Sequence, residues 1–369
     1  MKPLRIAQIA PLIESVPPCK YGGTERVVHH LTEELVGRGH HVTLFATGDS
    51  RTSAKLFPVV QRGLRLDGKC DCVFPSLLEL AKVYLEMAGA FDIIHSHIDC
   101  FTFPFAAASS TPTVLTMHGR LDLADFPAVL RGYGDLNYVS ISDAQRKPAP
   151  DINWAATIYH GYPPRCFPFN PEPSDYFLYL GRFSPEKAPD QAILLARQCG
   201  IPLRIAAKID PSEREYFERR IRPLLDHPLV EYLGEVGEAE KIELLKNARA
   251  LLNTIDWPEP FGLVMIESLA CGTPVIVRSC GSAPEIIRHG ETGFLCSSTS
   301  DFIEALGAVG SLSRNACRRD FEKRFTAGRM ADRYEQLYCR LLTGAFRGRA
   351  VGHACRSVTA RLTNGAKML

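Results

Sequence analysis

Short apolar segments alternate with amphipathic segments along most of this sequence, and this alternation limits the possible fold more than any other feature. The segments Leu4–Ala10 and His41–Thr47 have the length and composition of buried strands. Between them, Thr24 can cap a helix whose apolar residues recur at helical spacing until Gly39, where a helix usually stops. Strand, helix and strand in this order predict a parallel β-α-β unit.

The same rhythm fills the rest of the chain, with one interruption. Five prolines in the segment His160–Asp175 give it the composition of a linker. The further strands that we expect are Phe91–His97, Pro112–Gly119, Asn137–Ser142, Tyr176–Gly181, Leu203–Lys208, Val230–Gly234, Ala250–Ile255 and Pro274–Val277. The sequence therefore predicts an α/β protein with two Rossmann-like domains, each a doubly wound parallel sheet, facing each other across a cleft.

The predicted boundaries follow from these patterns. Residues 1–162 form the first domain, 163–174 the proline-rich linker and 175–324 the second domain. Residues 325–342 form a last amphipathic helix that needs a surface to cover. Residues 343–369 form a basic tail.

Composition narrows the class of protein. The chain has 369 residues, 46% of them hydrophobic, which is enough for two ordinary cores. Its 43 Lys and Arg nearly balance 41 Asp and Glu, so nucleic acid is not an expected partner. No apolar run has the length of a signal peptide or a membrane span, and the 12 cysteines scatter singly. We expect a cytoplasmic protein with reduced thiols.

The basic tail differs from the rest of the chain because it contains no acidic residue. It is either a solvated, poorly ordered end or a patch for weak peripheral contact with anionic lipid at the inner face of the membrane. Its basic residues are Arg347, Arg349, Arg356, Arg361 and Lys367.

Ligands of open parallel sheets bind beyond the carboxyl ends of the strands, so the loops there are the candidates for a site. Gly22 and Gly23 precede a predicted helix, where free N–H groups can bind an anion; a mobile turn is the alternative. Arg182 and Lys187 follow a predicted strand and suit a diphosphate. Their alternative is two solvated charges, with Lys187 paired to Glu186 or Asp190.

The segment WPEPFGLVMIESLACGTPVIV carries two carboxylates beside a very apolar stretch. Pro258 and Pro260 keep Glu259 out of regular helix. The helix expected from Phe261 to Ala270 is apolar all round, so Glu267 needs a hydrogen-bonding partner. Ligand hydroxyl groups would satisfy both carboxylates; alternatively, Glu267 reaches solvent on a polar edge or pairs with an internal arginine.

The order of these features closely resembles glycosyltransferase family 4 (glycosyl transferases group 1) of the GT-B fold, over about residues 1–342. The most specific segments are EPFGLVMIESLACGTPVI, GSAPEII and GETGFL. The resemblance implies a retaining, hexosyltransferase-type enzyme that takes a sugar from a nucleotide diphosphate, UDP- or GDP-linked, and uses no other cofactor. The acceptor, a glycan, a lipid-linked molecule or a small molecule, is not identified. The last helix would cross back onto the first domain.

The resemblance also assigns roles to individual residues. Arg182 and Lys187 would neutralise the departing diphosphate, Glu259 would accept hydrogen bonds from the donor sugar, and Glu267 would hold the ribose. His118 would lie beside the anomeric centre. The remaining donor contacts that it implies are at Gly22, Gly23, Val236, Phe261, Gly262, Leu263, Gly281 and Ser282.

At two places the sequence departs from the family pattern, so the family's residue roles cannot be assigned there. The hinge reads His160-Gly161-Tyr162-Pro163 instead of Asn-Gly, an apolar residue and Asp. Lys208-Ile209-Asp210 stands where the family often has a Gly-Pro loop, which makes Lys208 a candidate third cation near the nucleotide.

No Asp-x-Asp occurs in the sequence, so we expect no divalent metal. His95 and His97 could suggest a metal pair, but we interpret them as loop or acceptor-site groups. Two other functions remain open: a nucleotide-sugar epimerase on the same fold, which would use acid and base groups, and a non-catalytic two-lobed sugar-binding protein.

Overall fold

A parallel sheet of seven strands forms the first half of the chain in the computed structural model, which describes residues 2–20, 22–66 and 72–344. Its strand order is β3-β2-β1-β4-β5-β6-β7. The strands are β1 (Arg5–Ile9), β2 (His41–Ala46), β3 (Lys55–Pro58), β4 (Ile93–Ser96), β5 (Thr113–Thr116), β6 (Asn137–Ser140) and β7 (Trp154–Thr157). Its helices are α1 (Gly23–Gly37), α2 (Val73–Ala81), α3 (Phe103–Ala108) and α4 (Phe126–Gly132).

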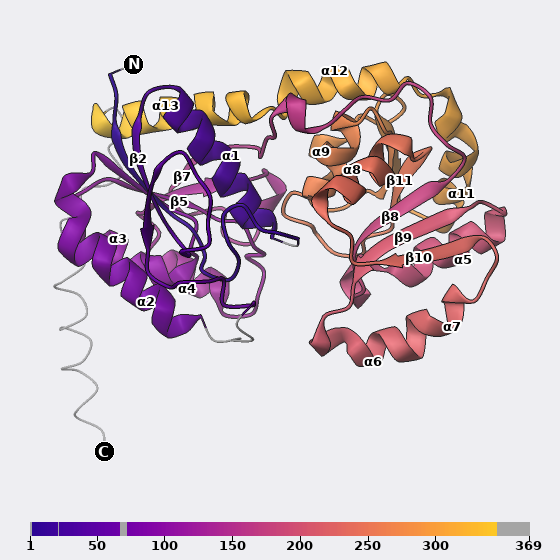
Figure 1. Cartoon of the computed structure of the whole chain (residues 1–369), viewed down its shortest axis with the longest axis horizontal. Helices are drawn as coiled ribbons and strands as arrows, with labels where there is room; N and C mark the ends of the chain where they lie inside the picture. Colours follow the sequence, from indigo (N-terminus) through magenta and orange to yellow (C-terminus); the bar gives the residue numbers. More distant parts are fainter. Residues whose placement is uncertain (1, 21, 67–71, 345–369) are drawn as a thin grey trace.

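A second parallel sheet, of six strands in the order β10-β9-β8-β11-β12-β13, forms the other domain. The strands are β8 (Phe177–Arg182), β9 (Leu203–Lys208), β10 (Val230–Gly234), β11 (Ala250–Asn253), β12 (Val275–Arg278) and β13 (Gly293–Cys296). The helices that follow β8 are α5 (Pro189–Cys199), α6 (Arg214–Tyr216), α7 (Arg222–Leu225), α8 (Glu238–Asn247), α9 (Leu263–Ala270), α10 (Ala283–Ile286), α11 (Thr299–Ala308), α12 (Arg314–Arg324) and α13 (Ala327–Leu342). The two domains lie side by side (Figure 1), which confirms the predicted α/β architecture.

Three strands and several helix starts differ from the sequence prediction. Strands β3, β7 and β13 were not predicted; each has only four residues and lies at an edge of its sheet, where it pairs with a single neighbour. Thr24 does not cap α1, since Gly22 is the N-cap residue. Helix α9 begins at Leu263 rather than at Phe261, because Gly262 adopts a positive φ of 82° before it.

Each sheet has a switch point, where the strand order reverses and a crevice opens beyond the carboxyl ends. In the first sheet this point lies between β1 and β4, and in the second between β8 and β11. The segments that leave these strands carry most of the candidate site residues. The fold therefore positions the two crevices as the place to look for a ligand.

The chain passes between the domains twice, and the two passages are hydrogen-bonded to each other. Tyr162 N–H donates to the carbonyl of Phe325 (3.0 Å), and Ala327 N–H donates to the carbonyl of Tyr162 (3.0 Å). A Cβ atom at Gly161 would overlap the carbonyl of Thr326, so this close approach requires glycine. The two passages between the domains are therefore closely packed, although the sequence at His160–Pro163 differs from the family pattern.

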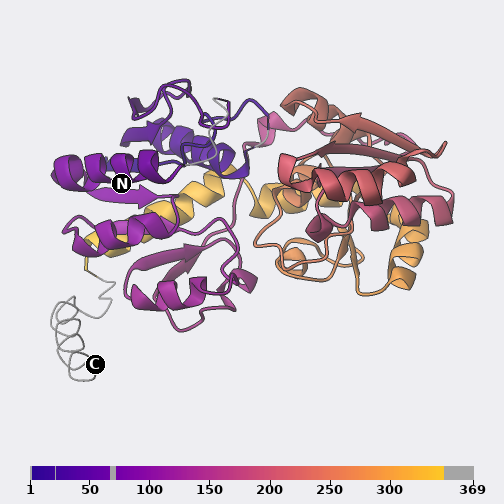
Figure 2. The ribbon, with the colours of Figure 1, turned by 90° about the horizontal axis from the view of Figure 1, so that it is seen from below.

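Helix α13 returns to the first domain after the second crossing, as the family resemblance implied. Figures 1 and 2 show it, in yellow, against the first domain, while α12 covers the second. Its buried face includes Tyr334, Leu337 and Tyr338, which pack into the core of the first domain with Ile6 and Leu31. The last helix, which follows α12 of the second domain in the chain, is thereby anchored to the first domain by apolar contacts.

No helix in the part of the chain that the structure describes combines the length and apolarity needed to cross a bilayer. The predicted lipid contact of the basic tail concerns residues 345–369, which lie outside the described residues.

We expect Leu337→Ala to destabilise the protein by about 2–4 kcal/mol, because it removes a fully buried side chain and leaves a cavity between α13 and the first sheet. The melting temperature should fall by roughly 5 to 10 °C in calorimetry. Leu342→Ala on the same helix is the control, since Leu342 is 41% exposed and should change little. Equal effects of the two substitutions would contradict the packing role of α13.

Candidate functional site

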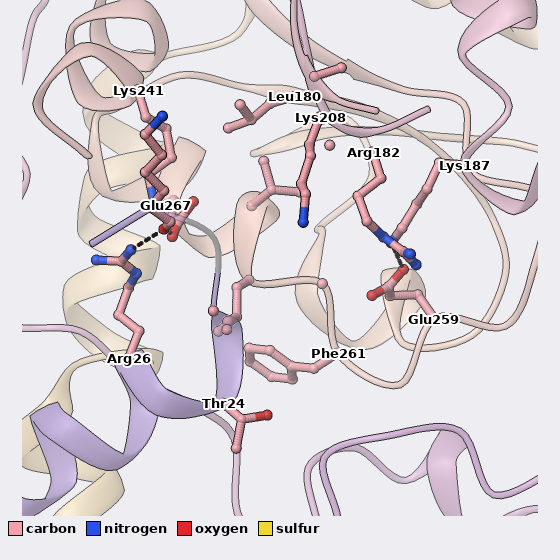
Figure 3. Close-up of a pocket in the computed structure, with 18 of the residues that line it drawn as sticks. Thr24, Arg26, Leu180, Arg182, Lys187, Lys208, Lys241, Glu259, Phe261 and Glu267 are labelled. Atoms are coloured by element: carbon pink, nitrogen blue, oxygen red, sulfur yellow. Dashed lines mark hydrogen bonds and ion pairs between the residues drawn. The ribbon is translucent and has the colours of Figure 1, made fainter. Parts of the chain in front are cut away.

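A cavity of about 470 Å³ lies between the two domains and is lined by residues from both. Twelve of the fourteen residues that the sequence placed at the site line it. They are Gly22, Gly23, His118, Arg182, Lys187, Lys208, Val236, Glu259, Phe261, Gly262, Leu263 and Glu267. Figure 3 shows Arg182, Lys187 and Lys208 reaching into this pocket from the second domain and Arg26 approaching it from α1.

Arg182 and Lys208 are neighbours because of strand register. They are the last residues of β8 and β9, and they lie opposite each other in the parallel pairing. Asp210, two residues beyond β9, lies between them, at 2.7 Å from Lys208 Nζ and 3.2 Å from Arg182 Nη1. Burial raises the pKa of Asp210, but its hydrogen bonds to Lys208 and Arg182 outweigh this and leave the pKa below its ordinary value. Asp210 therefore compensates the two cations as a carboxylate.

Lys187 is held in the same corner by the turn that follows β8. The hydroxyl of Tyr179 donates to the carbonyls of both Arg182 and Lys187, at 3.2 Å each, which fixes this turn. The ammonium group of Lys187 forms an ion pair with Glu259 and lies 5.4 Å from the centre of the Trp257 ring.

The alternative pairing of Lys187 with Glu186 or Asp190 is wrong. Glu186 pairs instead with Arg120 of the first domain (2.9 Å), and Asp190 accepts a hydrogen bond from Tyr216 (3.1 Å). The cation therefore faces the cavity together with Glu259.

Glu259 lies in the irregular segment between β11 and α9, as its flanking prolines predicted. Ser282 fixes this segment: its N–H donates to the carbonyl of Glu259 (3.0 Å) and its hydroxyl to that of Phe261 (2.6 Å). Gly281 packs so closely on the backbone of Glu259 that a Cβ atom would overlap it. Gly281 and Ser282 thus support the loop from behind and do not line the cavity, which corrects the position expected for them beside the donor sugar.

Glu267 is buried in the middle of α9 and also lines the cavity. Its carboxylate lies 2.8 Å from the ammonium group of Lys241 on α8. Lys241 also pairs with Glu238 (3.0 Å), which binds Arg26 of α1 across the cleft (2.9 Å). An internal cation therefore compensates Glu267, as in one of the alternatives, but the cation is a lysine rather than an arginine.

The Gly22-Gly23 loop brings the N-terminus of α1 to the cavity from the first domain. Gly22 has a φ of 151°, and Gly23 lies close to Leu263 at the start of α9. Glu25 lies in the first turn of α1, where burial raises its pKa to about 7. The N-terminus of α1 therefore lies in the cavity wall, and anion binding by its N–H groups stays a prediction.

His118 follows β5 and lies in the cavity wall, where its ring stacks on that of His160 with 5.1 Å between centroids. Burial lowers its pKa to about 3, so the ring is neutral at physiological pH. His97 lies behind it, with Nδ1 2.9 Å from Nε2 of His118.

The expectation that His95 and His97 are loop or acceptor-site groups is wrong for His95, which belongs to strand β4, whereas His97 lies in the loop directly after β4. Both side chains are buried, and neither lines the cavity. Within residues 2–20, 22–66 and 72–344, no three His, Cys, Asp or Glu side chains group as metal ligands would.

The sequence analysis missed three residues that shape the site: Asp210, Lys241 and Trp257. Asp210 could have been found, because side chains two residues apart at a strand end point the same way and Lys208 was already a candidate. Lys241 is one of several charged residues on α8, and nothing in its spacing indicates Glu267. Trp257 contacts Lys187 and Arg120 only through the fold.

Comparison with known proteins gives two adjoining family matches. Residues 21–159 match the sequence pattern of Glycosyltransferase Family 4, and residues 167–323 match that of Glycosyl transferases group 1. A phosphatidyl-myo-inositol mannosyltransferase of Mycobacterium leprae (strain TN) is 24% identical over 344 residues, which cover 86% of this chain and 89% of the relative. A D-inositol 3-phosphate glycosyltransferase of Rhodococcus erythropolis is 34% identical over 146 residues, 36% of this chain and 32% of the relative.

Solved structures share the fold. AviGT4, a glycosyltransferase involved in avilamycin A biosynthesis, superposes with a TM-score of 0.73 at 24% identity, over 93% of this chain and 99% of that one. HepE of Anabaena, crystallised with UDP and glucose, gives a TM-score of 0.69 at 18% identity, over 90% and 98% of the two chains. With one family match on each sheet and the same two-sheet architecture, the chain belongs to the group 1, family 4 glycosyltransferases of the GT-B fold.

Proposed function

We propose that this glycosyltransferase transfers a hexose from a nucleoside diphosphate donor to a hydroxyl group, with retention of configuration at the anomeric carbon. The observation that carries the proposal is the convergence of Arg182, Lys187 and Lys208 on one corner of the interdomain cavity. Three cations held together at the ends of two parallel strands and the following turn suit a polyanionic group better than any neutral ligand.

Charge development in the reaction fits this arrangement. Glycosyl transfer passes through an oxocarbenium-like state while negative charge grows on the departing diphosphate. The fixed cations of the second domain and the N–H groups at the start of α1 stabilise that charge without reorganising. The leaving group therefore binds between Arg182, Lys187 and the Gly22-Gly23 loop.

The ion pair between Lys187 and Glu259 describes the site without a donor. A bound diphosphate competes with Glu259 for Lys187, which leaves the carboxylate oxygens of Glu259 able to accept hydrogen bonds from the sugar hydroxyls. The ribose hydroxyls bind at Glu267, whose charge Lys241 already balances. In this arrangement, Lys187 exchanges Glu259 for the diphosphate, and Glu267 keeps Lys241. Donor binding therefore leaves no buried charge without a partner.

The donor is UDP- or GDP-linked in this proposal, and the acceptor binds against the first domain. The structure of HepE with UDP and glucose supports a nucleotide sugar as donor. The name of the mannosyltransferase relative supports a hexose as the transferred sugar. A glycan, a lipid-linked molecule or a small polyol is the acceptor class consistent with a hydroxyl nucleophile.

Catalysis in this proposal needs no divalent cation, because side-chain cations take the place that a metal has at other diphosphate sites.

We expect Lys187→Ala and Glu259→Ala each to lower kcat/KM by at least ~100-fold, since each removes a preorganised charge at the reacting sugar or the leaving group. Lys246→Ala is the matched control, because Lys246 pairs with Glu243 on α8 and does not line the cavity. Initial rates with a transferable sugar nucleotide measure the effect, and circular dichroism checks folding. Near-normal transfer by either site variant would refute the assignment of that residue.

Transfer should continue unchanged in excess EDTA, since no metal takes part. The measurement is product formation before and after chelation, with added magnesium or manganese as the comparison. Loss of activity that magnesium or manganese restores would exclude a metal-independent mechanism.

UDP-, GDP- and ADP-sugars should differ in the rise of melting temperature that they cause, because only the matching donor binds the native state tightly. With that donor, NMR of the first-formed product should show the same anomeric configuration as the donor. An inverted product would disprove retention, and a free epimerised sugar without a glycosylated acceptor would indicate an epimerase.

A further inference from the structure

A chain of buried hydrogen bonds runs from the first strand to the cavity wall. Nε2 of His97 lies 2.8 Å from Oε1 of Gln8, and Nδ1 of His97 lies 2.9 Å from Nε2 of His118. Gln8 and His97 are buried, and only His118 reaches the cavity. The three side chains come from β1 and from the segments that follow β4 and β5.

The donor and acceptor of each hydrogen bond between Gln8, His97 and His118 follow from the chemistry of the Gln8 amide. An amide oxygen can only accept, so Nε2 of His97 must carry the proton that bonds Gln8. Burial lowers the pKa of His97 well below its ordinary value, so the ring is neutral and its Nδ1 has only a lone pair. That lone pair accepts the hydrogen of Nε2 of His118, and the Nδ1 atom of His118 is then the unprotonated one.

The other end of the Gln8 amide contacts strand β4 and helix α13. The amide nitrogen of Gln8 lies 3.4 Å from Nδ1 of His95 and 3.5 Å from the hydroxyl oxygen of Tyr338. Nδ1 of His95 also lies 2.7 Å from the Tyr338 hydroxyl, and Nε2 of His95 lies 2.7 Å from Oγ1 of Thr116. In the His95 tautomer with a bare Nδ1, Tyr338 donates to Nδ1 and Nε2 donates to Thr116, which suits the amide nitrogen of Gln8 on this side and its oxygen on the side of His97.

Nδ1 of His118 has no hydrogen-bond partner among residues 2–20, 22–66 and 72–344, although the ring lies in the cavity wall. We propose that Gln8 and His97 are positioning residues that hold His118 in the Nε2–H tautomer, so that its Nδ1 accepts a hydrogen bond from a hydroxyl group of the bound sugar. This proposal rests on the proposed function for the nature of the ligand, but the tautomer itself does not.

A fixed tautomer has a physical advantage over an isolated histidine. A free imidazole exchanges between its two neutral tautomers. In the tautomer with Nδ1–H, the histidine would donate the hydrogen bond and the sugar hydroxyl would have to accept it. The hydrogen bonds from Gln8 through His97 to His118 exclude the Nδ1–H tautomer of His118 before the ligand binds. No change of tautomer is then needed during the reaction. The Tyr338 hydroxyl extends this control to α13, the helix that joins the two domains.

The direct test is nitrogen-15 NMR of the full-length protein labelled at histidine, because protonated and bare ring nitrogens have well-separated shifts. His118→Asn identifies the His118 signals by their loss. We expect Nε2–H and bare Nδ1 for both His97 and His118 in the protein without ligand. Nδ1–H at His118 would overturn the proposal, whatever the activity.

Two substitutions at His97 test the consequence. In His97→Asn the amide oxygen can take the place of Nδ1 and still accept from His118, whereas His97→Leu removes the acceptor. We expect His97→Leu to lower kcat by about 10-fold, the order of one hydrogen bond in the transition state, with the donor KM changed less than about twofold. His97→Asn should recover most of that loss.

Donor-dependent thermal stabilisation, measured for both variants, shows whether each is folded and binds the nucleotide sugar. Equal kcat losses in the two variants, at equal stability, would overturn the positioning role. If no nucleotide sugar is ever bound or turned over, the proposed function fails, while the NMR measurement still decides the tautomer of His118.

Discussion

The repulsion between cations at the ends of β8 and β9 is the constraint around which the second half of the site is organised. Parallel register makes Arg182 and Lys208 direct neighbours on strands about 4.8 Å apart. Asp210 offsets both charges, and Glu259 offsets the third cation, Lys187. The folded protein thus holds three cations in place by fixed carboxylate partners, so the site that we propose for a diphosphate is assembled before a ligand binds.

The first half of the site depends on a different interaction, the double crossing between the domains. The hydrogen bonds between Tyr162 and the segment Phe325–Ala327 hold the two passages together. The second passage then directs α13 onto the first sheet, where Tyr338 reaches His95. One helix therefore contributes both to interdomain packing and to the hydrogen-bond network behind His118.

Much of the fold could be predicted because its signals are local. Each β-α-β unit carries its own apolar strand and amphipathic helix, and glycines mark the turns. The missing strands β3, β7 and β13 are short, and their conformation depends on pairing with a neighbour rather than on their own residues. The family resemblance placed Gly281 and Ser282 beside the donor sugar. In the structure these residues instead hold the backbone of Glu259, a contact that depends on tertiary structure.

The sequence by itself determined that the loops after the strands would gather at the cavity, since parallel sheets bring the carboxyl ends of their strands to one edge. It also determined that Glu259 lies outside the helix, because two prolines exclude helical geometry there. Only the tertiary structure decided the charge partners: Asp210 for Arg182, Lys241 for Glu267 and Glu259 for Lys187. The physical reason is that an ion pair forms between side chains close in space, and these partners come from separate elements or loops whose distance the chain order does not fix.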